Sequence, residues 1–393
     1  MNILLDFIPF QNNQGIGGAA SFAKAVYDRL AATPHSGCRL FAAFNSAIPS
    51  GLIYGYQQMA ELYQAELVDI STTPLSAAIS QHHIDVFFIA IGQYYEAYDI
   101  QGINCKTIMF IHDIFEFERA DNKIDLIIYD QEKNDKKDWL KRCINLFSGR
   151  WDRQVRKRYG EVMRLYAQPN TLAYTVSNYS RNALHYYFPE IKKDIRVCYS
   201  PIRMSSCSDD IENKALEQLV QQKRQYILML AANRRYKNAQ ILTKVYKRLQ
   251  KDYPDLYLLT LKYGKTIHSQ HIDIPYLSDS DLEHAYKHAY VLVFPSFLEG
   301  FGYPPVEAMK YGTPTVASNV TSIPEVMGDA AIYFSPFYPA DLYRALKDVL
   351  GNHDIRKEQI LSRRTQIAKL QEEHLSHLVS EILSGQMPSL SDH

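Results

Sequence analysis

A segment rich in glycine and proline, at residues 299–307, has the composition of an anion-binding loop. It reads EGFGYPPVE and follows the apolar run Val291–Phe294. Gly300 and Gly302 let backbone N–H groups approach an anion closely, because neither residue carries a Cβ. The two adjacent prolines suit the first turn of a helix, where the missing N–H is not needed. The amides and the positive dipole end of such a helix favour a phosphate group.

Glutamates stand at both ends of this segment and suit a ligand with several hydroxyl groups. Glu307 falls about one turn into the expected helix, where its carboxylate can accept hydrogen bonds from the paired hydroxyls of a ribose. Glu299 precedes the loop and can bind a second polyhydroxyl group. Ribose, diphosphate and sugar are the parts of a sugar nucleotide, so the segment predicts a sugar-nucleotide site.

A cluster of positive charge at residues 231–238 follows the first strand expected in the C-terminal half. It reads AANRRYKN and holds Arg234, Arg235 and Lys237. Cations here can neutralise a diphosphate leaving group, Arg through a two-pronged contact and Lys as a point charge. Both arginines compete for that role, and a solvated basic turn is the alternative. Gly264 follows the next strand, and we expect it to line the pocket for the base.

Two features of the N-terminal half suit a ligand site as well. Residues 12–20, NNQGIGGAA, connect the first strand to a helix, and a glycine loop in that position cradles phosphate in many proteins. The loop contains Gly17 and Gly18, although a plain turn has the same composition. His112 follows the strand Thr107–Ile111. A lone histidine at a strand end is usually structural, but ligands of doubly wound sheets bind at the carboxyl ends of strands, so an active-site role for His112 is the alternative.

The D-x-D pattern at Asp279–Asp281 has two interpretations. Such carboxylates can bind a divalent metal ion. Here the pattern opens an amphipathic helix, which favours Ser278 or Asp279 as the N-cap. We therefore expect no metal at these residues.

Short apolar runs alternate with longer helical patterns along the chain. Most runs are continuously hydrophobic, which is typical of parallel strands buried on both faces. Their alternation with helices predicts an α/β protein with two Rossmann-like doubly wound sheets. The expected strands are Ile3–Ile8, Arg39–Phe44, Val86–Ile91, Thr107–Ile111, Leu172–Val176, Tyr226–Leu230, Leu256–Leu261, Val291–Phe294, Thr315–Ala317 and Ala331–Phe334, and the expected helices include Ala20–Ala32, Ala239–Lys251 and Asp281–Ala289.

A polar stretch after Pro201 predicts a domain boundary. The residues SSCSDDIENK are poor in apolar side chains, as linkers are. We expect an N-terminal domain over residues 1–205 and a C-terminal domain over 206–365. The remaining segment, 366–393, contains an amphipathic helix and a tail. That helix must dock its apolar face, and the N-terminal domain is one place for it.

The bulk composition excludes several classes of protein. Lys and Arg number 43, as do Asp and Glu, so the chain lacks the net positive charge of many nucleic-acid binders. The five scattered cysteines form no CxxC pair, which argues against a disulfide framework or a zinc site. The first residues read as a strand rather than a signal peptide, and no apolar run reaches the ~18 residues of a membrane-spanning helix. We expect a cytoplasmic protein.

Residues 136–164 combine ten Lys and Arg residues with Trp139, Phe147 and Trp151. Basic and aromatic side chains together suit an anionic membrane surface, here the inner face. In that case the protein is peripheral and its acceptor is lipid-linked. A solvated helix face has the same composition, and it is the interpretation we favour.

Three segments of the C-terminal half resemble the retaining glycosyltransferases of family 4, which have the GT-B fold. They are E-G-F-G-x-P-x-x-E-A-M at 299–309, G-x-P-x-V-A-S-N at 312–319 and I-P-E-V-x-G-D-A-A at 323–331. The resemblance extends over the whole chain and is weaker in the N-terminal half. It implies two domains facing a central cleft and transfer of a hexose or deoxyhexose from a nucleotide-diphosphate sugar. The implied acceptor is a glycan or lipid-linked glycan of a surface polysaccharide, and neither a metal nor another cofactor is implied.

The resemblance also gives roles to the residues named above. Glu307 would hold the ribose, Glu299 and His112 would contact the transferred sugar, and the basic cluster would contact the diphosphate. The implied catalytic residues are His112, Glu299, Lys237 and Arg235, and the implied substrate-binding residues are Gly17, Gly18, Arg234, Gly264, Phe301, Gly302, Tyr303 and Glu307. Family members often have Leu in place of Tyr303, so that position bears either on donor-sugar selection or on packing alone.

Two other interpretations stay open from the sequence. One is a different GT-B enzyme, such as a sugar-nucleotide epimerase or a glycan phosphorylase. The other is a catalytically silent subunit that binds a partner enzyme. The presence of Glu299, Glu307, Lys237 and the glycine loop argues against a silent subunit.

Overall fold

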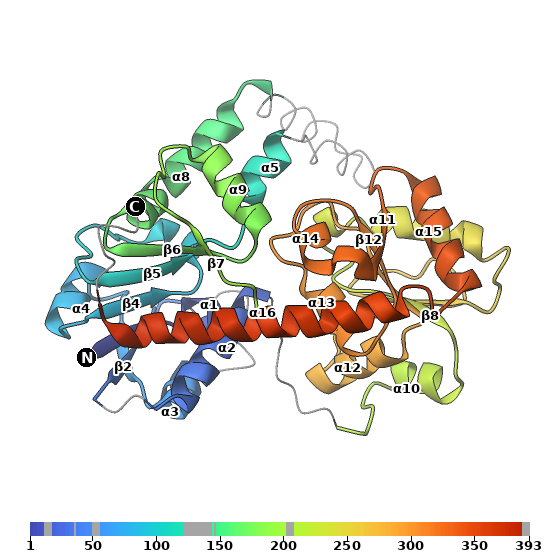
Figure 1. Ribbon diagram of the computed structural model, residues 1–393, viewed down its shortest axis with the longest axis horizontal. Helices are drawn as coiled ribbons and strands as arrows, with labels where there is room; N and C mark the ends of the chain where they lie inside the picture. Colours follow the sequence, from blue (N-terminus) through green and yellow to red (C-terminus); the bar gives the residue numbers. More distant parts are fainter. Residues whose placement is uncertain are drawn as a thin grey trace. The chain divides into compact units, whose positions relative to one another are not determined.

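The computed structural model describes residues 1–11, 18–34, 37–48, 56–121, 144, 147–201 and 208–386. The chain divides into two compact units (Figure 1). Unit 1 comprises Met1–Ala120, Cys143–Arg203 and Leu370–His393, and unit 2 comprises Asp121–Arg142 and Met204–Lys369. The boundary expected after residue 205 falls in the segment 202–207, outside the described residues. Within the described ranges, no helix is long and apolar enough to cross a membrane.

Unit 1 is built on a seven-stranded parallel sheet with the order β3-β2-β1-β4-β5-β6-β7. Its inner strands are apolar and buried, as expected for strands covered on both faces. The strands are β1 (Asn2–Asp6), β2 (Arg39–Phe44), β3 (Glu66–Asp69), β4 (Val86–Ile89), β5 (Lys106–Phe110), β6 (Thr171–Thr175) and β7 (Arg196–Val197). The helices are α1 (Ile8–Gln11), α2 (Gly18–Ala32), α3 (Tyr56–Tyr63), α4 (Leu75–Gln81), η2 (Gly92–Ala97), α5 (Phe115–Asp121), α8 (Arg150–Ala167) and α9 (Asn178–Tyr187).

Unit 2 is built on a six-stranded parallel sheet with the order β10-β9-β8-β11-β12-β13. The strands are β8 (Tyr226–Met229), β9 (Tyr257–Leu261), β10 (His271–Ile274), β11 (Val291–Phe294), β12 (Thr315–Ser318) and β13 (Ala331–Phe334). The helices are α10 (Lys214–Gln221), η3 (Arg235–Lys237), α11 (Ala239–Leu249), α12 (Asp279–His288), α13 (Tyr303–Lys310), α14 (Ile323–Met327), η4 (Gly328–Ala330) and α15 (Pro339–Gly351).

The two sheets share one topology. Counted within its own unit, each begins with the order 3-2-1-4-5-6, which is the order of dinucleotide-binding sheets. The direction of strand progression reverses between the first and fourth strands, which are β1 and β4 in unit 1 and β8 and β11 in unit 2. Ligands of such sheets bind in the crevice beyond the carboxyl ends of the strands at this reversal. The topology therefore marks one candidate edge in each unit.

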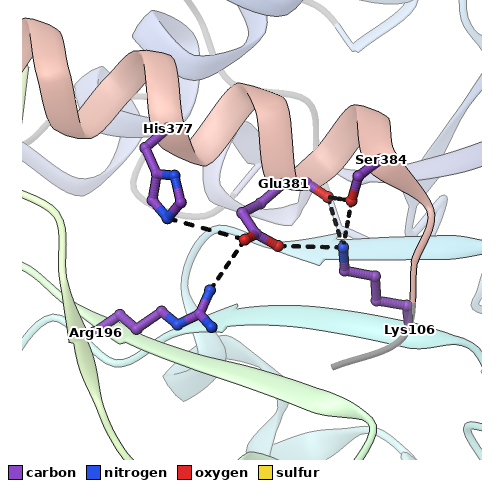
Figure 2. Close-up of polar contacts among 5 residues, drawn as sticks. All are labelled: Lys106, Arg196, His377, Glu381 and Ser384. Carbon is purple, nitrogen blue, oxygen red and sulfur yellow. Dashed lines mark hydrogen bonds and ion pairs between the residues drawn. The ribbon is translucent and has the colours of Figure 1, made fainter. Parts of the chain in front are cut away.

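The last helix, α16 (Lys357–Ser384), starts in unit 2 and ends in unit 1. Figure 2 shows its final turns against the sheet of unit 1. Lys106, at the start of β5, is 1% exposed and donates from Nζ to the backbone oxygen of Glu381 at 2.7 Å, with the Glu381 carboxylate at 3.4 Å. Arg196, at the start of β7, contacts the same carboxylate at 3.2 Å. Leu378, Val379 and Ile382, in this part of the helix, are buried.

Helix α8 carries the described part of the basic and aromatic stretch. Its apolar face, including Val155, Tyr159 and Val162, is buried in the core of unit 1. Arg153 and Lys157 are exposed on the outer face. The apolar side of this helix is thus used for packing within the unit, and its outer face presents basic side chains. Trp139 and the basic residues at 136, 137, 141 and 142 lie outside the described residues.

All ten expected strands are present, with ends that shift by no more than two residues at either terminus. Three strands were not expected: β3, β7 and β10. Each is an edge strand of its sheet, and each is short and partly exposed. These three strands bury less apolar surface than the inner strands, and their sequences carry no continuous hydrophobic run.

Candidate active site

The loop that precedes α13 has the backbone conformation expected from its glycine and prolines. Gly302 is the N-cap residue of α13 with φ of 99°, a left-handed conformation that favours glycine. Proline occupies the first turn of the helix, as predicted. The hydroxyl of Ser322 donates to the backbone oxygens of Glu299 and Phe301, at 2.9 and 3.2 Å. The loop is therefore fixed by the segment that follows β12.

Lys237 and Glu299 form a buried ion pair at the carboxyl edge of this sheet. The Nζ of Lys237 lies 2.5 Å from Oε1 of Glu299, and the two residues are 6% and 8% exposed. Lys237 follows β8 and Glu299 follows β11, so the pair spans the reversal of strand order. Sequence reasoning predicted both residues for the site. Their direct contact, 62 positions apart in the chain, was not predicted.

Aromatic rings complete the surroundings of this lysine. Its ammonium lies 4.5 Å from the ring centre of Phe294 and 5.3 Å from that of Tyr236. Burial lowers the pKa of Lys237, and the Glu299 carboxylate opposes that shift. A cation enclosed in this way interacts more strongly with an incoming phosphate than an exposed one, because little water screens it.

Arg234 and Arg235 lie on the same turn as Lys237, and both are exposed. Arg234 is the N-cap residue of η3 and donates from Nη1 to the hydroxyl of Tyr236 at 3.1 Å. Arg235 is the first residue of η3. The geometry does not distinguish which arginine meets a diphosphate, and the choice stays a prediction.

Glu307 lies on α13, where its carboxylate meets a residue that the sequence analysis did not single out. The hydroxyl of Tyr286, on α12, donates to Oε2 of Glu307 at 2.5 Å. Tyr303, at the first position of α13, packs edge-on against Phe301 with ring centres 5.7 Å apart. The predicted phosphate-facing amides and the predicted ribose residue thus belong to one helix and the loop before it.

Gly264 lies after β9 in a left-handed conformation, with φ of 86°. Its N–H donates to Oδ2 of Asp273 at 2.7 Å, and the hydroxyl of Thr260 donates to the other oxygen at 2.6 Å. His271 contacts the same hydroxyl through Nε2 at 2.8 Å. The turn expected to line the base pocket is therefore held by β10, a strand that the sequence did not predict.

In unit 1, His112 lies after β5 as predicted, but it is a buried, neutral group. Its Nε2 lies 2.9 Å from the backbone oxygen of Ala90, and burial lowers its pKa to about 4. Nε2 therefore carries the proton and donates, since a carbonyl oxygen can only accept. Gly18 opens α2, whereas Gly17 lies outside the described residues.

The D-x-D pattern serves structural roles among the described residues. Ser278 is the N-cap of α12, as expected, and accepts a hydrogen bond from the N–H of Asp281 at 3.1 Å. The Asp281 carboxylate accepts from the backbone N–H groups of Glu212 and Asn213, at 2.9 and 3.1 Å. In the described part of the chain, no cluster of His, Cys, Asp or Glu has the geometry of a metal site.

Comparison with known proteins shows sequence similarity over most of the second unit. Residues 210–366 match the family model described as Glycosyl transferases group 1. The serotype-specific mannosyltransferase WbdA of Escherichia coli is 33% identical over 174 residues, 40% of this chain and 21% of WbdA. The O-antigen chain mannosyltransferase RfbU of Salmonella typhimurium is 27% identical over 193 residues, 46% of this chain and 50% of RfbU. The chain thus spans one fifth to one half of the length of these relatives.

Solved structures match over nearly the whole chain. The sucrose-phosphate synthase of Thermosynechococcus elongatus superposes with a TM-score of 0.67 at 13% identity, covering 98% of this chain and 100% of that structure. WaaG, a glycosyltransferase involved in lipopolysaccharide biosynthesis, superposes with a TM-score of 0.60 at 13% identity and the same coverage. The prediction of a GT-B fold is confirmed. The chain has the GT-B fold, and its residues 210–366 match the family model Glycosyl transferases group 1.

Proposed function

We propose that this protein is a glycosyltransferase that moves a hexose from a nucleoside-diphosphate sugar to a glycan acceptor in polysaccharide synthesis. The observation that carries the proposal is the Lys237–Glu299 pair beside the N-terminus of α13, at the reversal of strand order. A buried cation, a helix N-terminus and two carboxylates suit the diphosphate and the hydroxyl groups of such a donor. Mannose is the first sugar to test, since the relatives named above are mannosyltransferases.

Solved structures of one protein with a similar fold contain a nucleotide sugar or its parts. Structures of HepE from Anabaena contain UDP with glucose or UDP-glucose, and that fold superposes with a TM-score of 0.63 at 14% identity. This likeness shows the fold alone. The proposal of a nucleotide-sugar donor therefore rests on the residues of this chain. The experiment below tests which base the donor carries.

In the proposed reaction, Lys237 and the amides at the start of α13 stabilise the diphosphate as it leaves, together with Arg234 or Arg235. Stabilising this developing charge is the main electrostatic task of transfer. Glu299 binds hydroxyls of the transferred sugar, and Glu307 binds the ribose. His112 is neutral and its only N–H is bonded to Ala90, so it orients the sugar or acceptor by accepting a hydrogen bond at Nδ1 rather than by transferring a proton. The proposal includes retention of anomeric configuration and no resident metal.

The acceptor is a glycan or a lipid-linked glycan, and peripheral contact with an anionic membrane belongs to the same proposal. Its support is the exposed basic face of α8, with Arg153 and Lys157, and the exposed rings of Phe147 and Tyr186. Contact of this kind is electrostatic, because the apolar face of α8 packs in the core of unit 1.

The experiment is a transfer assay with UDP- and GDP-linked mannose and glucose and octyl mannoside as acceptor. A glycoside whose new linkage has the donor's anomeric configuration supports the whole proposal, and an inverted linkage removes retention from it. Interconversion of the donor sugar without acceptor would indicate an epimerase, and a requirement for inorganic phosphate would indicate a phosphorylase. Absence of both donor binding and turnover in a folded sample would favour the silent subunit.

A further inference from the structure

The hydroxyl of Tyr286 makes a short contact with a predicted ligand-binding carboxylate. Tyr286 is 1% exposed on α12, and its hydroxyl donates to Oε2 of Glu307 at 2.5 Å. Hydrogen bonds to ionised carboxylates are short and stronger than bonds between neutral groups. A buried phenol thus fixes a carboxylate that lies at the margin of the site.

Tyr286 is itself held firmly, so its hydroxyl occupies a defined position. The ring packs in a cluster of unit 2 that includes Leu228, Leu292 and Ala308. Its backbone oxygen accepts from the hydroxyl of Thr313 at 2.7 Å. An ion pair of 3.0 Å between Lys310 and Glu283 joins α13 to α12 close by. The ion pair links the two helices about one turn from the Tyr286–Glu307 contact, and Thr313 ties the segment after α13 to α12.

A neighbouring tyrosine shows that this arrangement is not needed to satisfy a buried phenol. Tyr226, in β8, is fully buried in the same cluster, and its hydroxyl donates to the backbone oxygen of Ala285 at 2.8 Å. A backbone carbonyl is therefore sufficient for a phenol in this core. Tyr286 instead contacts a side chain that sequence reasoning assigns to substrate.

We propose that Tyr286 is a positioning residue for the ribose of the donor, acting by fixing the rotamer of Glu307. The inference rests on the proposed function, since that function gives Glu307 its ligand. A carboxylate offers about four acceptor positions, more than the single bond from Tyr286 occupies, so the same group can accept from two neighbouring ribose hydroxyls. Because Tyr286 fixes the side chain of Glu307 before the nucleotide binds, binding costs less side-chain conformational entropy.

The test compares ribose with deoxyribose in a nucleotide probe. Isothermal titration measures Kd for UDP and GDP and, for whichever binds more tightly, for its 2′-deoxy form, with the wild type, Tyr286→Phe and Tyr226→Phe. Both variants delete one buried hydroxyl from the same cluster, so they match in their effect on packing. We expect Tyr286→Phe to weaken binding of the ribonucleotide about tenfold, while binding of the deoxynucleotide changes little. Tyr226→Phe should retain the wild-type ratio of the two affinities.

The outcomes separate this inference from the function on which it rests. If the wild type prefers the ribonucleotide and Tyr286→Phe keeps the full preference, Tyr286 is a packing residue and the inference is wrong. If Tyr286→Phe weakens both nucleotides equally and Tyr226→Phe does the same, the effect is loss of stability and the inference is again wrong. A wild type that binds neither nucleotide, or binds both equally, overturns the ribose role of Glu307 itself.

Discussion

Each unit contains an ion pair between a buried lysine and a glutamate, and the two pairs lie at opposite edges of their sheets. In unit 1, Lys106 begins β5 and pairs with Glu381 of α16, at the amino edge (Figure 2). In unit 2, Lys237 follows β8 and pairs with Glu299, at the carboxyl edge. Ligands of doubly wound sheets bind at the carboxyl edge. We therefore assign the first pair to stability and the second to donor binding.

The carboxyl edges differ as well. At that edge unit 1 presents His112, neutral and bonded to a backbone oxygen, and Asp6, fully buried and bonded to the hydroxyl of Tyr95 at 2.8 Å. Unit 2 presents a cation, carboxylates and a helix N-terminus. Two sheets of one topology thus provide equivalent places, and the side chains at those places decide the chemistry. The charged edge suits a diphosphate, and the neutral edge suits hydroxyl groups.

The largest expected effect is on transfer by Lys237→Ala. Loss of one preorganised electrostatic group from an active site lowers kcat roughly 100- to 1000-fold, and we expect a fall of this size in kcat/KM for transfer. The matched control is Lys244→Ala, an exposed lysine on α11 that should leave kcat/KM within about twofold.

Lys237→Ala also leaves Glu299 buried without its partner, which by itself destabilises a protein by about 3–5 kcal/mol. The neutral double variant Lys237→Met/Glu299→Gln removes this effect. We expect it to recover stability in urea unfolding and to remain inactive. Activity near the wild-type value in that variant would show that the pair has only a structural role.

The second prediction concerns the pair in unit 1. Glu381→Gln removes the charge that faces buried Lys106, and we expect the free energy of unfolding to fall by about 2–4 kcal/mol. At a temperature where the variant is folded, kcat/KM should stay within about threefold of the wild type. Glu373→Gln, exposed on the same helix, is the control for stability. A large loss of kcat/KM in folded Glu381→Gln would show that the pair in unit 1 also supports transfer, which contradicts the assignment of that pair to stability.

The third prediction is a pH dependence of stability that arises in unit 1. Burial raises the pKa of Asp6 from 3.8 to about 7, so the folded state holds a proton that the unfolded chain releases. The associated stability is complete below about pH 4 and is lost as the pH rises through 7. Between pH 5 and 8 the wild type should lose about 2–3 kcal/mol that Asp6→Asn does not lose.

Urea unfolding at both pH values measures this difference, with Glu61→Gln, an exposed carboxylate of α3, as the control. Equal pH dependence of Asp6→Asn and the wild type would mean that Asp6 is ionised in the folded protein throughout this range.

The fourth prediction has the smallest expected effect: His112 should not change its protonation state near neutral pH. With a pKa near 4, His112 should stay neutral between pH 8 and about 5.5, with the proton on Nε2. Nitrogen chemical shifts of labelled histidine measure the tautomer directly. A midpoint near 6.5 for His112 would make it a proton-transfer group and would remove the contrast between the two edges.

Much of this fold could be predicted because strands that are buried on both faces have continuously apolar sequences. The run Val291–Phe294 is apolar throughout, since both faces of β11 are covered. Strand β10, with the sequence HIDI, carries no such signal. Its placement depends on contacts with β9, such as that between Thr260 and His271, which only the folded chain reveals.

The candidate site also has a part that the local sequence predicts and a part that only the folded chain reveals. Glycine, proline and glutamate at 299–307 could be interpreted locally, because their roles follow from conformation and spacing within one loop. The residues that these side chains contact elsewhere in the chain could not be predicted locally. Tyr286 lies on a helix where a tyrosine most often fills the core, and no local spacing links it to Glu307. The same holds for Lys237 and Glu299, which meet only through the order of the strands.

The most direct test of the central claim is a crystal structure of the protein with the nucleoside diphosphate that binds more tightly of UDP and GDP. The account predicts Nζ of Lys237 in contact with a phosphate oxygen, the Glu299 carboxylate released from that lysine, and the ribose hydroxyls on Glu307. A nucleotide bound elsewhere, with the Lys237–Glu299 pair intact, would contradict the account.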